Sequence, residues 1–202
     1  MYSNELLTWA AKQLGCSIPA VQAVAEVESN GGGLDSDGRC KILYEAHLFH
    51  KFTHGKFREK HPELSCLDWK EARAYYKRDQ WERFSSAYQL DPSAAIRSCS
   101  WGAFQILGMN YKGCGYPSPE VMATAMSDGA GGRTAEEEHL WAFVNFMRYN
   151  KFDRYLRLPS WEQFALAYTG PGYRQNKYDS KLLWAYNKFR GMPKETPVDG
   201  GK

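Results

Sequence analysis

Apolar residues recur at helical spacing through the first positions of the chain. Ser3 is a residue type that commonly caps the start of a helix, and Gly15 stands where helices commonly end. The apolar stripe between them consists of Leu6, Leu7, Ala10, Ala11 and Leu14. This pattern predicts a first helix between Ser3 and Gly15.

A second helical face follows Pro19, which is tolerated in the first turn of a helix. The face consists of Val21, Val24, Ala25 and Glu28. These positions obey the i, i+3, i+4, i+7 rule, so an otherwise apolar face ends on a carboxylate. Three glycines at positions 31–33 then end the helix.

Residues 34–45 have the pattern of a small β-hairpin. Asp37 and Gly38 form a favoured turn pair, and residues 42–44 are the expected return strand. Residues 100–106 form a compact apolar segment between a short helix and a glycine-rich loop.

Two capping boxes mark helices in the second half of the chain. Thr134 with Glu137 precedes one amphipathic run, and Ser160 with Gln163 precedes another. A final helix is expected around residues 182–189. These patterns predict a mainly α fold with one small β-hairpin.

The segment from about residue 53 to residue 96 is more polar and carries its own helix signals. Asp68 with Glu71 suggests a helix start, and Asp91 with Pro92 suggests another. We interpret this segment as a helical lobe inserted into a single domain of residues 1–190. Residues 191–202 are expected to form a disordered tail.

Composition and charge exclude several classes of protein. The 202 residues are 43% hydrophobic, which is enough for a substantial core. The 26 basic and 23 acidic residues are interspersed, giving a net charge of +3 without the basic stripe of a nucleic-acid binder. No apolar run approaches the ~20 residues that span a bilayer, and no signal peptide is seen. We expect a monomer that is made in the cytoplasm, binds no nucleic acid and does not insert stably into membranes.

Cysteine and histidine provide no clear catalytic or metal site. The five cysteines form no Cys-x-x-Cys pair, which favours reduced thiols over a disulfide framework, with a cysteine nucleophile as a minor alternative. The neighbourhood of His47, His50 and His54 lacks a His-Glu-x-x-His arrangement. We therefore expect no metal and no cofactor.

Glu28 has the features of a general acid. Burial on an apolar face and the negative end of a helix dipole both disfavour the carboxylate anion, and so both raise the pKa of the group. A carboxylic acid with a raised pKa can protonate the leaving oxygen of a glycosidic bond. The alternative is a polar side chain that points to solvent at a fraying helix end.

The order of several short motifs resembles the lysozyme and lytic transglycosylase superfamily. Glu28 and Ser29 end a helix, residues 102–106 read Gly-Ala-Phe-Gln-Ile, and residues 167–170 read Ala-Tyr-Thr-Gly. Residues 24–29, 37–39, 42–47, 168–173 and 178–179 resemble the phage endolysins of the N-acetylmuramidase family. The likeness covers about residues 4–190. It implies a lysozyme-like fold with the hairpin at the cleft.

The resemblance implies an enzyme that cleaves the β-1,4 bond between N-acetylmuramic acid and N-acetylglucosamine in peptidoglycan, causing bacterial lysis. Glu28 would be the acid, and Asp37, nine positions later, would activate water in an inverting reaction. Asp37 has an alternative role as a turn residue. The residues expected to contact the glycan strand are Tyr44, Glu45, Gln105 and Tyr168.

Some of these assignments have alternatives. Glu45 is also a third candidate carboxylate, or else a structural hydrogen-bonding group, and Tyr168 can be read as a core residue. A lytic transglycosylase would need the same Glu28 but no second carboxylate, and a non-catalytic peptidoglycan-binding protein would need neither. Resemblance to an endolysin further implies passage from the host cytoplasm to the wall through a phage-encoded pore.

Overall fold

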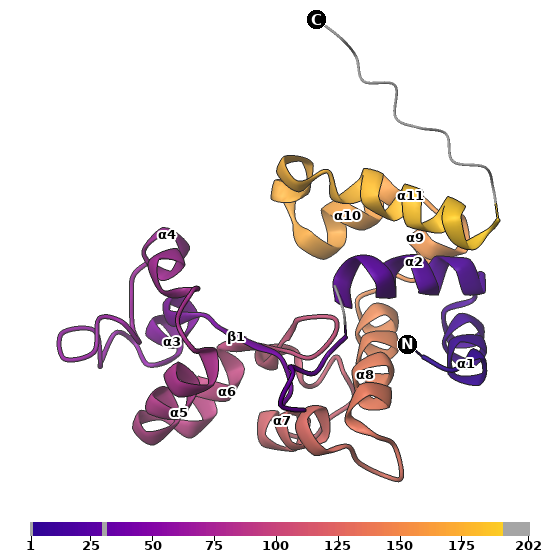
Figure 1. Ribbon diagram of the computed structural model, residues 1–202. Coiled ribbons are helices and arrows are strands. Elements are labelled where there is room, and N and C mark those ends of the chain that lie inside the picture. Colours follow the sequence, from indigo (N-terminus) through magenta and orange to yellow (C-terminus); the bar gives the residue numbers. More distant parts are fainter. Residues whose placement is uncertain (1, 30–31, 192–202) are drawn as a thin grey trace, which may run out of the picture. The chain divides into compact units, whose positions relative to one another are not determined.

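The computed structural model describes residues 2–29 and 32–191, with the side chain of Ser29 excluded, and these residues are mainly helical (Figure 1). They divide into two compact units. The terminal unit contains residues 3–28 and 151–191, and the central unit contains residue 2, residue 29 and residues 32–150. The predicted disordered tail lies outside the described residues except for Gly191.

The terminal unit is built from helices whose ends match the sequence signals closely. Ser3 caps the first helix by accepting a hydrogen bond from the backbone N–H of Leu6 at 3.2 Å. Gly15 ends that helix in the left-handed conformation, with φ 66°, which favours glycine. The helices of this unit are α1 (Asn4–Leu14), α2 (Ile18–Ser29, of which Ser29 belongs to the central unit), α9 (Arg154–Arg157), α10 (Trp161–Thr169), η3 (Pro171–Asn176) and α11 (Tyr178–Phe189).

One capping prediction in this unit is wrong in its detail. Helix α10 begins at Trp161, as the pattern indicated, but Ser160 makes no side-chain cap hydrogen bond. Its hydroxyl donates to the carbonyl oxygen of Leu158 at 3.3 Å, so it is directed to the preceding turn. The predicted capping box of Thr134 and Glu137 in the central unit is confirmed, with both reciprocal hydrogen bonds present.

The central unit holds the longest helix, which is α8, and a group of shorter ones. Aspartates at positions 68, 79 and 91 each cap a short helix with their carboxylates. The helices are α3 (Ala46–Phe52), α4 (Trp69–Ala72), η1 (Arg73–Tyr75), α5 (Gln80–Leu90), α6 (Pro92–Arg97), η2 (Gly108–Asn110), α7 (Pro119–Asp128) and α8 (Ala135–Tyr149).

A three-stranded antiparallel sheet crosses the central unit in the order β1-β2-β3. The strands are β1 (Ile42–Tyr44), β2 (Cys99–Trp101) and β3 (Ile106–Leu107). The expected hairpin of residues 34–45 is much reduced, because it retains only one bridge, between Leu34 and Cys40. The expected return strand β1 instead pairs with β2, with Ile42 opposite Trp101.

The inserted lobe shares its core with this sheet. The indole of Trp81 donates to the carbonyl oxygen of Cys40 at 2.9 Å, and its ring lies 6.0 Å from that of Trp101. Phe84 packs edge-on against the same Trp101 ring at 5.5 Å. Two of the lobe's aromatic side chains therefore pack it onto β2, and the lobe belongs to the central unit.

Two glycines are required by close packing around the buried ring of His139. A Cβ atom at Gly33 would lie 2.1 Å from Nδ1 of His139, and one at Gly102 would lie 2.4 Å from Cδ2. Gly33 thus packs the loop after α2 onto α8, besides ending the glycine run that follows the helix. The ring itself hydrogen-bonds the carbonyl oxygen of Met126 at 2.8 Å.

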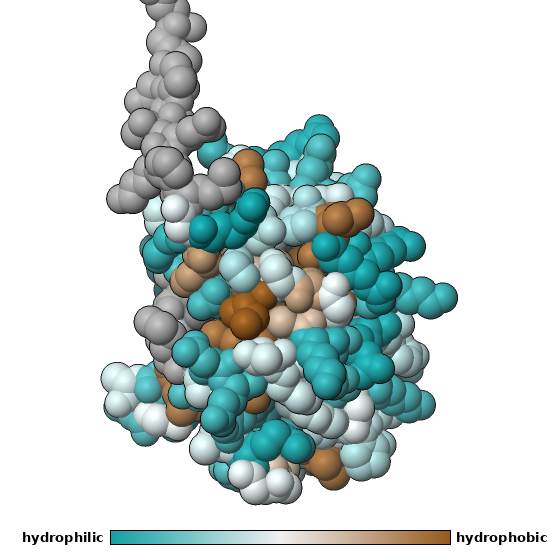
Figure 2. Space-filling view, turned by 90° about the vertical axis from the view of Figure 1, so that its right-hand side faces the viewer, coloured by the Kyte–Doolittle hydropathy of each residue, from teal (hydrophilic) through white to brown (hydrophobic). Residues whose placement is uncertain are grey.

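The surface is mostly hydrophilic on the side drawn in Figure 2, where apolar side chains occur as small separate patches between polar ones. Scattered apolar side chains of this kind are normal for a protein surface. No described helix is long and apolar enough to cross a membrane.

Candidate functional site

Glu28 lies in the last turn of α2, on the half-buried side of the helix. Burial raises the pKa of its carboxyl group from the ordinary 4.5 to about 7. A hydrogen bond from the hydroxyl of Tyr178 to Oε1 opposes this rise, because it stabilises the anion. The group therefore holds its proton near neutral pH, as a general acid must.

Tyr178 is a neighbour of Glu28 that the sequence did not identify as a site residue. It opens α11, directly after Lys177, which adopts a left-handed conformation with φ 49°. Burial, and then the charge of Glu28, hold the pKa of Tyr178 well above its ordinary value, so the phenol remains a donor. The two residues are 150 positions apart, so no local spacing could pair them. Tyr178 appeared only in a motif that resembled the family.

Tyr168 lies on α10 in the same unit as Glu28. Its ring stacks on Phe164 at 5.3 Å, which is the core packing that its position on the helix suggested. It is half-buried, and it is close enough to Tyr178 to raise the pKa of that phenol. The terminal unit thus places Tyr178 beside the candidate acid and Tyr168 near Tyr178.

Asp37 lies in an exposed loop of the central unit. Its side chain is 70% exposed, and its Oδ2 atom is 3.5 Å from Nη2 of Arg39. Asp35, rather than Asp37, organises the turn, since its Oδ1 accepts the backbone N–H groups of Asp37 and Arg39 at 2.9 Å each. Asp37 is therefore not needed as the hydrogen-bonding residue of this turn.

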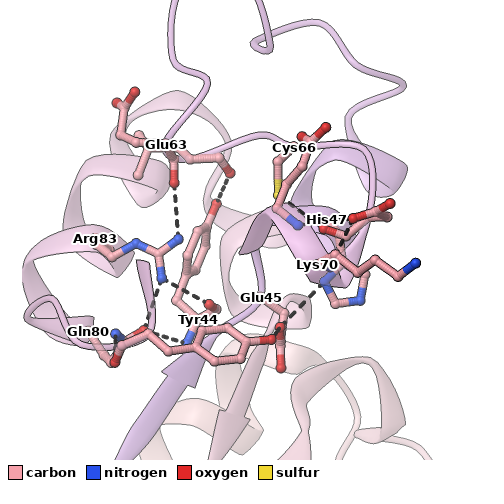
Figure 3. A network of polar contacts seen from close by, with 12 residues as sticks. Tyr44, Glu45, His47, Glu63, Cys66, Lys70, Gln80 and Arg83 are labelled. Carbon is pink, nitrogen blue, oxygen red and sulfur yellow. Dashed lines mark hydrogen bonds and ion pairs between the residues drawn. The ribbon is translucent and has the colours of Figure 1, made fainter. Parts of the chain in front are cut away.

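Glu45 lies where β1 ends and α3 begins, and its side chain is only 15% exposed. It occupies the capping position of α3 but makes no side-chain cap hydrogen bond. Its Oε2 atom instead accepts a hydrogen bond of 2.6 Å from the hydroxyl of Tyr76 and lies 3.4 Å from Nδ1 of His47 (Figure 3). Glu45 is thus a half-buried carboxylate held by the inserted lobe.

Tyr44 was expected to contact substrate, and the structure does not support this role. Its side chain is fully buried, and its hydroxyl donates to the carbonyl oxygen of Leu64 at 2.8 Å. A buried ring with an occupied hydroxyl is a core residue. Tyr44 instead anchors the strand that carries Glu45.

Gln105 lies exposed in the turn that joins β2 to β3. Its backbone has φ 45°, a left-handed conformation that is uncommon for a residue other than glycine. Its Nε2 atom donates to the carbonyl oxygen of Gly102 at 2.9 Å and approaches that of Lys41 at 3.4 Å. These contacts hold the amide against the backbone of the turn. Strained residues of this kind often occur at functional sites.

The predicted site residues are divided between the two units. Glu28 and Tyr168 lie in the terminal unit, which also contains Tyr178, the hydrogen-bond partner of Glu28. The central unit carries the remaining four, which are Asp37, Tyr44, Glu45 and Gln105. Within the central unit, Tyr44 and Glu45 share one network with the lobe, whereas Asp37 lies outside it.

The described cysteines do not form an activated nucleophile. All five thiols are free. Burial raises the pKa of Cys40 and of Cys114 to about 12, and that of Cys16 and of Cys66 to about 11. A reactive thiolate needs the opposite shift. In the described part of the chain, no three His, Cys, Asp or Glu side chains are grouped so as to hold a metal ion.

Comparison with known proteins gives a consistent result. The family model for N-acetylmuramidases matches residues 17–190. The crystal structure of Burkholderia AP3 phage endolysin is similar to this chain with a TM-score of 0.83 and 35% sequence identity, over 94% of this chain and 72% of that chain. No curated protein matches.

Proposed function

Since this chain belongs to the N-acetylmuramidase family, we propose that it cleaves the β-1,4 bond between N-acetylmuramic acid and N-acetylglucosamine. Membership of the family makes it a peptidoglycan hydrolase of the glycoside hydrolase class. We further propose that this cleavage lyses the host cell, and that the protein reaches the wall from the host cytoplasm.

Glu28 is the proposed catalytic acid, and its raised pKa is the observation that carries the proposal. A glycosidic oxygen is a poor leaving group, so its departure requires a proton at working pH. Burial keeps that proton on Glu28 up to about pH 7. The hydroxyl of Tyr178 contacts one carboxyl oxygen, and we propose that this contact fixes the orientation of the acid.

A second carboxylate is required to activate water or to stabilise the developing positive charge on the sugar. Asp37 and Glu45 are the two candidates. Low exposure and a fixed orientation favour Glu45, whose side chain is 15% exposed and held by Tyr76. Asp37 is 70% exposed, and its contacts are two long ones, with Nη2 of Arg39 at 3.5 Å and with the hydroxyl of Ser36 at 3.4 Å. We therefore propose Glu45 for this role and retain Asp37 as the competing candidate.

Three single variants test these assignments on purified sacculi. Glu28→Gln and Glu45→Gln are each expected to lower kcat by about 100-fold or more, because removal of a general acid or base usually has at least that effect. Asp37→Asn should stay within a few fold of wild type, since asparagine also tolerates the turn. Glu26→Gln is the matched control, because Glu26 lies on the same helix and forms an exposed ion pair with Lys188 at 2.7 Å.

The outcomes separate the candidates. Near-normal activity of Glu28→Gln would remove the proposed acid. Loss of activity in Asp37→Asn with retention in Glu45→Gln would return the second role to Asp37. Retention in both would favour a lytic transglycosylase, in which the substrate's own hydroxyl attacks. Absence of any cleavage by the wild-type protein would favour a non-catalytic peptidoglycan-binding protein.

A further inference from the structure

The inserted lobe reaches the candidate second carboxylate through a single side chain. Tyr76 follows the short helix η1 of the lobe, and its hydroxyl lies 2.6 Å from Oε2 of Glu45. The two residues are 31 positions apart and come from different elements. Figure 3 shows Glu45 in one network with Gln80 and Arg83 of the lobe. This short hydrogen bond joins the lobe to the end of β1.

Gln80 fixes the backbone on both sides of this hydrogen bond. Its Nε2 atom donates to the carbonyl oxygen of Tyr76 at 3.1 Å, and its Oε1 atom accepts the backbone N–H of Tyr44 at 3.1 Å. One side chain thus ties the residue that carries the phenol to the residue that precedes Glu45. The side-chain amide of Gln80 therefore fixes the backbone positions of Tyr76, which donates the hydrogen bond, and of Tyr44, which precedes the acceptor Glu45.

Arg83 secures the same strand end from inside the lobe. It is only 5% exposed, and its Nη1 atom donates to the carbonyl oxygen of Tyr44 at 3.2 Å. Its Nη2 atom donates to the carbonyl oxygen of Glu63 at 3.0 Å, and its guanidinium lies 4.9 Å from the centre of the Tyr44 ring. The lobe therefore holds both the N–H and the C=O of Tyr44.

The contacts of Glu45 are one-sided. Oε2 receives the hydroxyl of Tyr76 and faces His47, whereas no donor from the described residues reaches Oε1. A carboxylate that acts on water or on a sugar needs one accessible oxygen and a fixed direction. The network holds Oε2 and leaves Oε1 without a hydrogen-bond donor from the described residues.

We propose that Tyr76 is a positioning residue for Glu45, so that the inserted lobe completes the setting of the second carboxylate. This inference rests on the proposed function and on the role given there to Glu45. Burial, and then the hydrogen bond to Glu45, raise the pKa of Tyr76 above its ordinary value. The phenol therefore stays a neutral donor throughout the working range of the enzyme.

The first test is Tyr76→Phe, which removes only the hydroxyl. Removal of a hydrogen bond to a charged group is expected to lower kcat by about 10-fold. KM should stay within about twofold of wild type, because the lost contact is to Glu45 and not to substrate. Tyr75→Phe is the matched control, because Tyr75 is the adjacent tyrosine and its hydroxyl makes no hydrogen bond to the described residues. Circular dichroism and the melting temperature report whether each variant is folded.

A double-mutant cycle with Glu45→Asp tests whether Tyr76 acts through Glu45. The aspartate carboxylate is one methylene group shorter and loses the contact, so Tyr76→Phe should change kcat by less than about twofold in this background. An undiminished effect of Tyr76→Phe in the Glu45→Asp background would overturn the inference. So would a rise in KM with unchanged kcat, which would indicate direct contact with substrate.

The inference and the proposed function fail in different ways. If Glu45→Gln is inactive while Tyr76→Phe has wild-type kcat, the role of Tyr76 is overturned and that of Glu45 stands. If Glu45→Gln retains wild-type activity, the role of Glu45 is overturned and the inference falls with it. Loss of kcat in Tyr76→Phe, coupled to Glu45 and absent from Tyr75→Phe, supports both.

Discussion

Replacement of Glu28 by glutamine should make the protein more stable at alkaline pH while it lowers kcat by about 100-fold or more. The substitution keeps the shape of the side chain and an oxygen that can accept the hydroxyl of Tyr178, but it removes the charge. Burial raises the pKa of Glu28 from the ordinary 4.5 to about 7. At 1.36 kcal/mol for each pH unit, the ionised carboxylate destabilises the folded state by about 3 kcal/mol at most.

The sign of the pH dependence follows from which state binds the proton. Below pH 4.5 Glu28 is protonated in both the folded and the unfolded chain, so it does not make the free energy of unfolding depend on pH. Between pH 4.5 and about 7 only the folded chain retains it, so the free energy of unfolding falls as the pH rises. Above about pH 7 the loss is complete and constant.

Urea unfolding at pH 4 and at pH 8, followed by circular dichroism, measures this effect. Glu28→Gln should exceed wild type by up to about 3 kcal/mol at pH 8 and should match it within about 0.5 kcal/mol at pH 4. Glu26→Gln, which loses only an exposed ion pair, should differ from wild type by less than about 1 kcal/mol at both pH values. A catalytic residue such as the proposed acid Glu28 often lowers the stability of the folded protein.

The reasoning would be refuted if the difference in free energy of unfolding between Glu28→Gln and wild type were the same at pH 4 and at pH 8. It would also be refuted by a variant that is less stable at pH 8. Either result would mean that the carboxyl group of Glu28 ionises in the folded protein near its ordinary pKa. Burial would then not prepare it for proton donation.

Two further predictions concern the neighbour of the acid and the surface of the lobe. Tyr178→Phe should raise the pKa of Glu28 further, because the hydroxyl of Tyr178 stabilises the anion. The alkaline limb of the kcat/KM profile should therefore move to higher pH, and a move to lower pH would contradict this prediction. Joint neutralisation of Lys70, Arg73 and Lys77, which are all exposed, should weaken binding to sacculi more at low salt than at ~0.15 M, where charges are already screened. Unchanged binding at low salt by the folded variant would leave the lobe without a role in wall attraction.

Local sequence signals predicted the helices that frame the acid. Ser3 and Gly15 bound α1 as their types indicate, and the face of α2 ends on Glu28. The raised pKa of Glu28 also follows from its place on an apolar face, since burial is the larger cause. These features depend on residues within a few turns of one another, and so a single sequence contains them.

Contacts between distant segments could not be predicted in the same way. The pairing of Tyr44 with Cys99 in the sheet and the contact of Tyr178 with Glu28 join residues far apart in the chain. The expected hairpin is not formed in full, because β1 pairs with β2 rather than with the loop that precedes it. Burial of Tyr44 likewise depends on the lobe, whose packing the polar composition of its sequence did not reveal.

Product analysis of digested sacculi tests the central claim most directly. Mass spectrometry of the fragments released by the wild-type protein should find N-acetylmuramic acid at the new reducing ends, and Glu28→Gln should release them at least about 100-fold more slowly. Fragments that end in the 1,6-anhydro form, which is one water lighter, would contradict a hydrolase and indicate a transglycosylase. New reducing ends on N-acetylglucosamine, or cleavage confined to the peptide stems, would contradict the proposed bond.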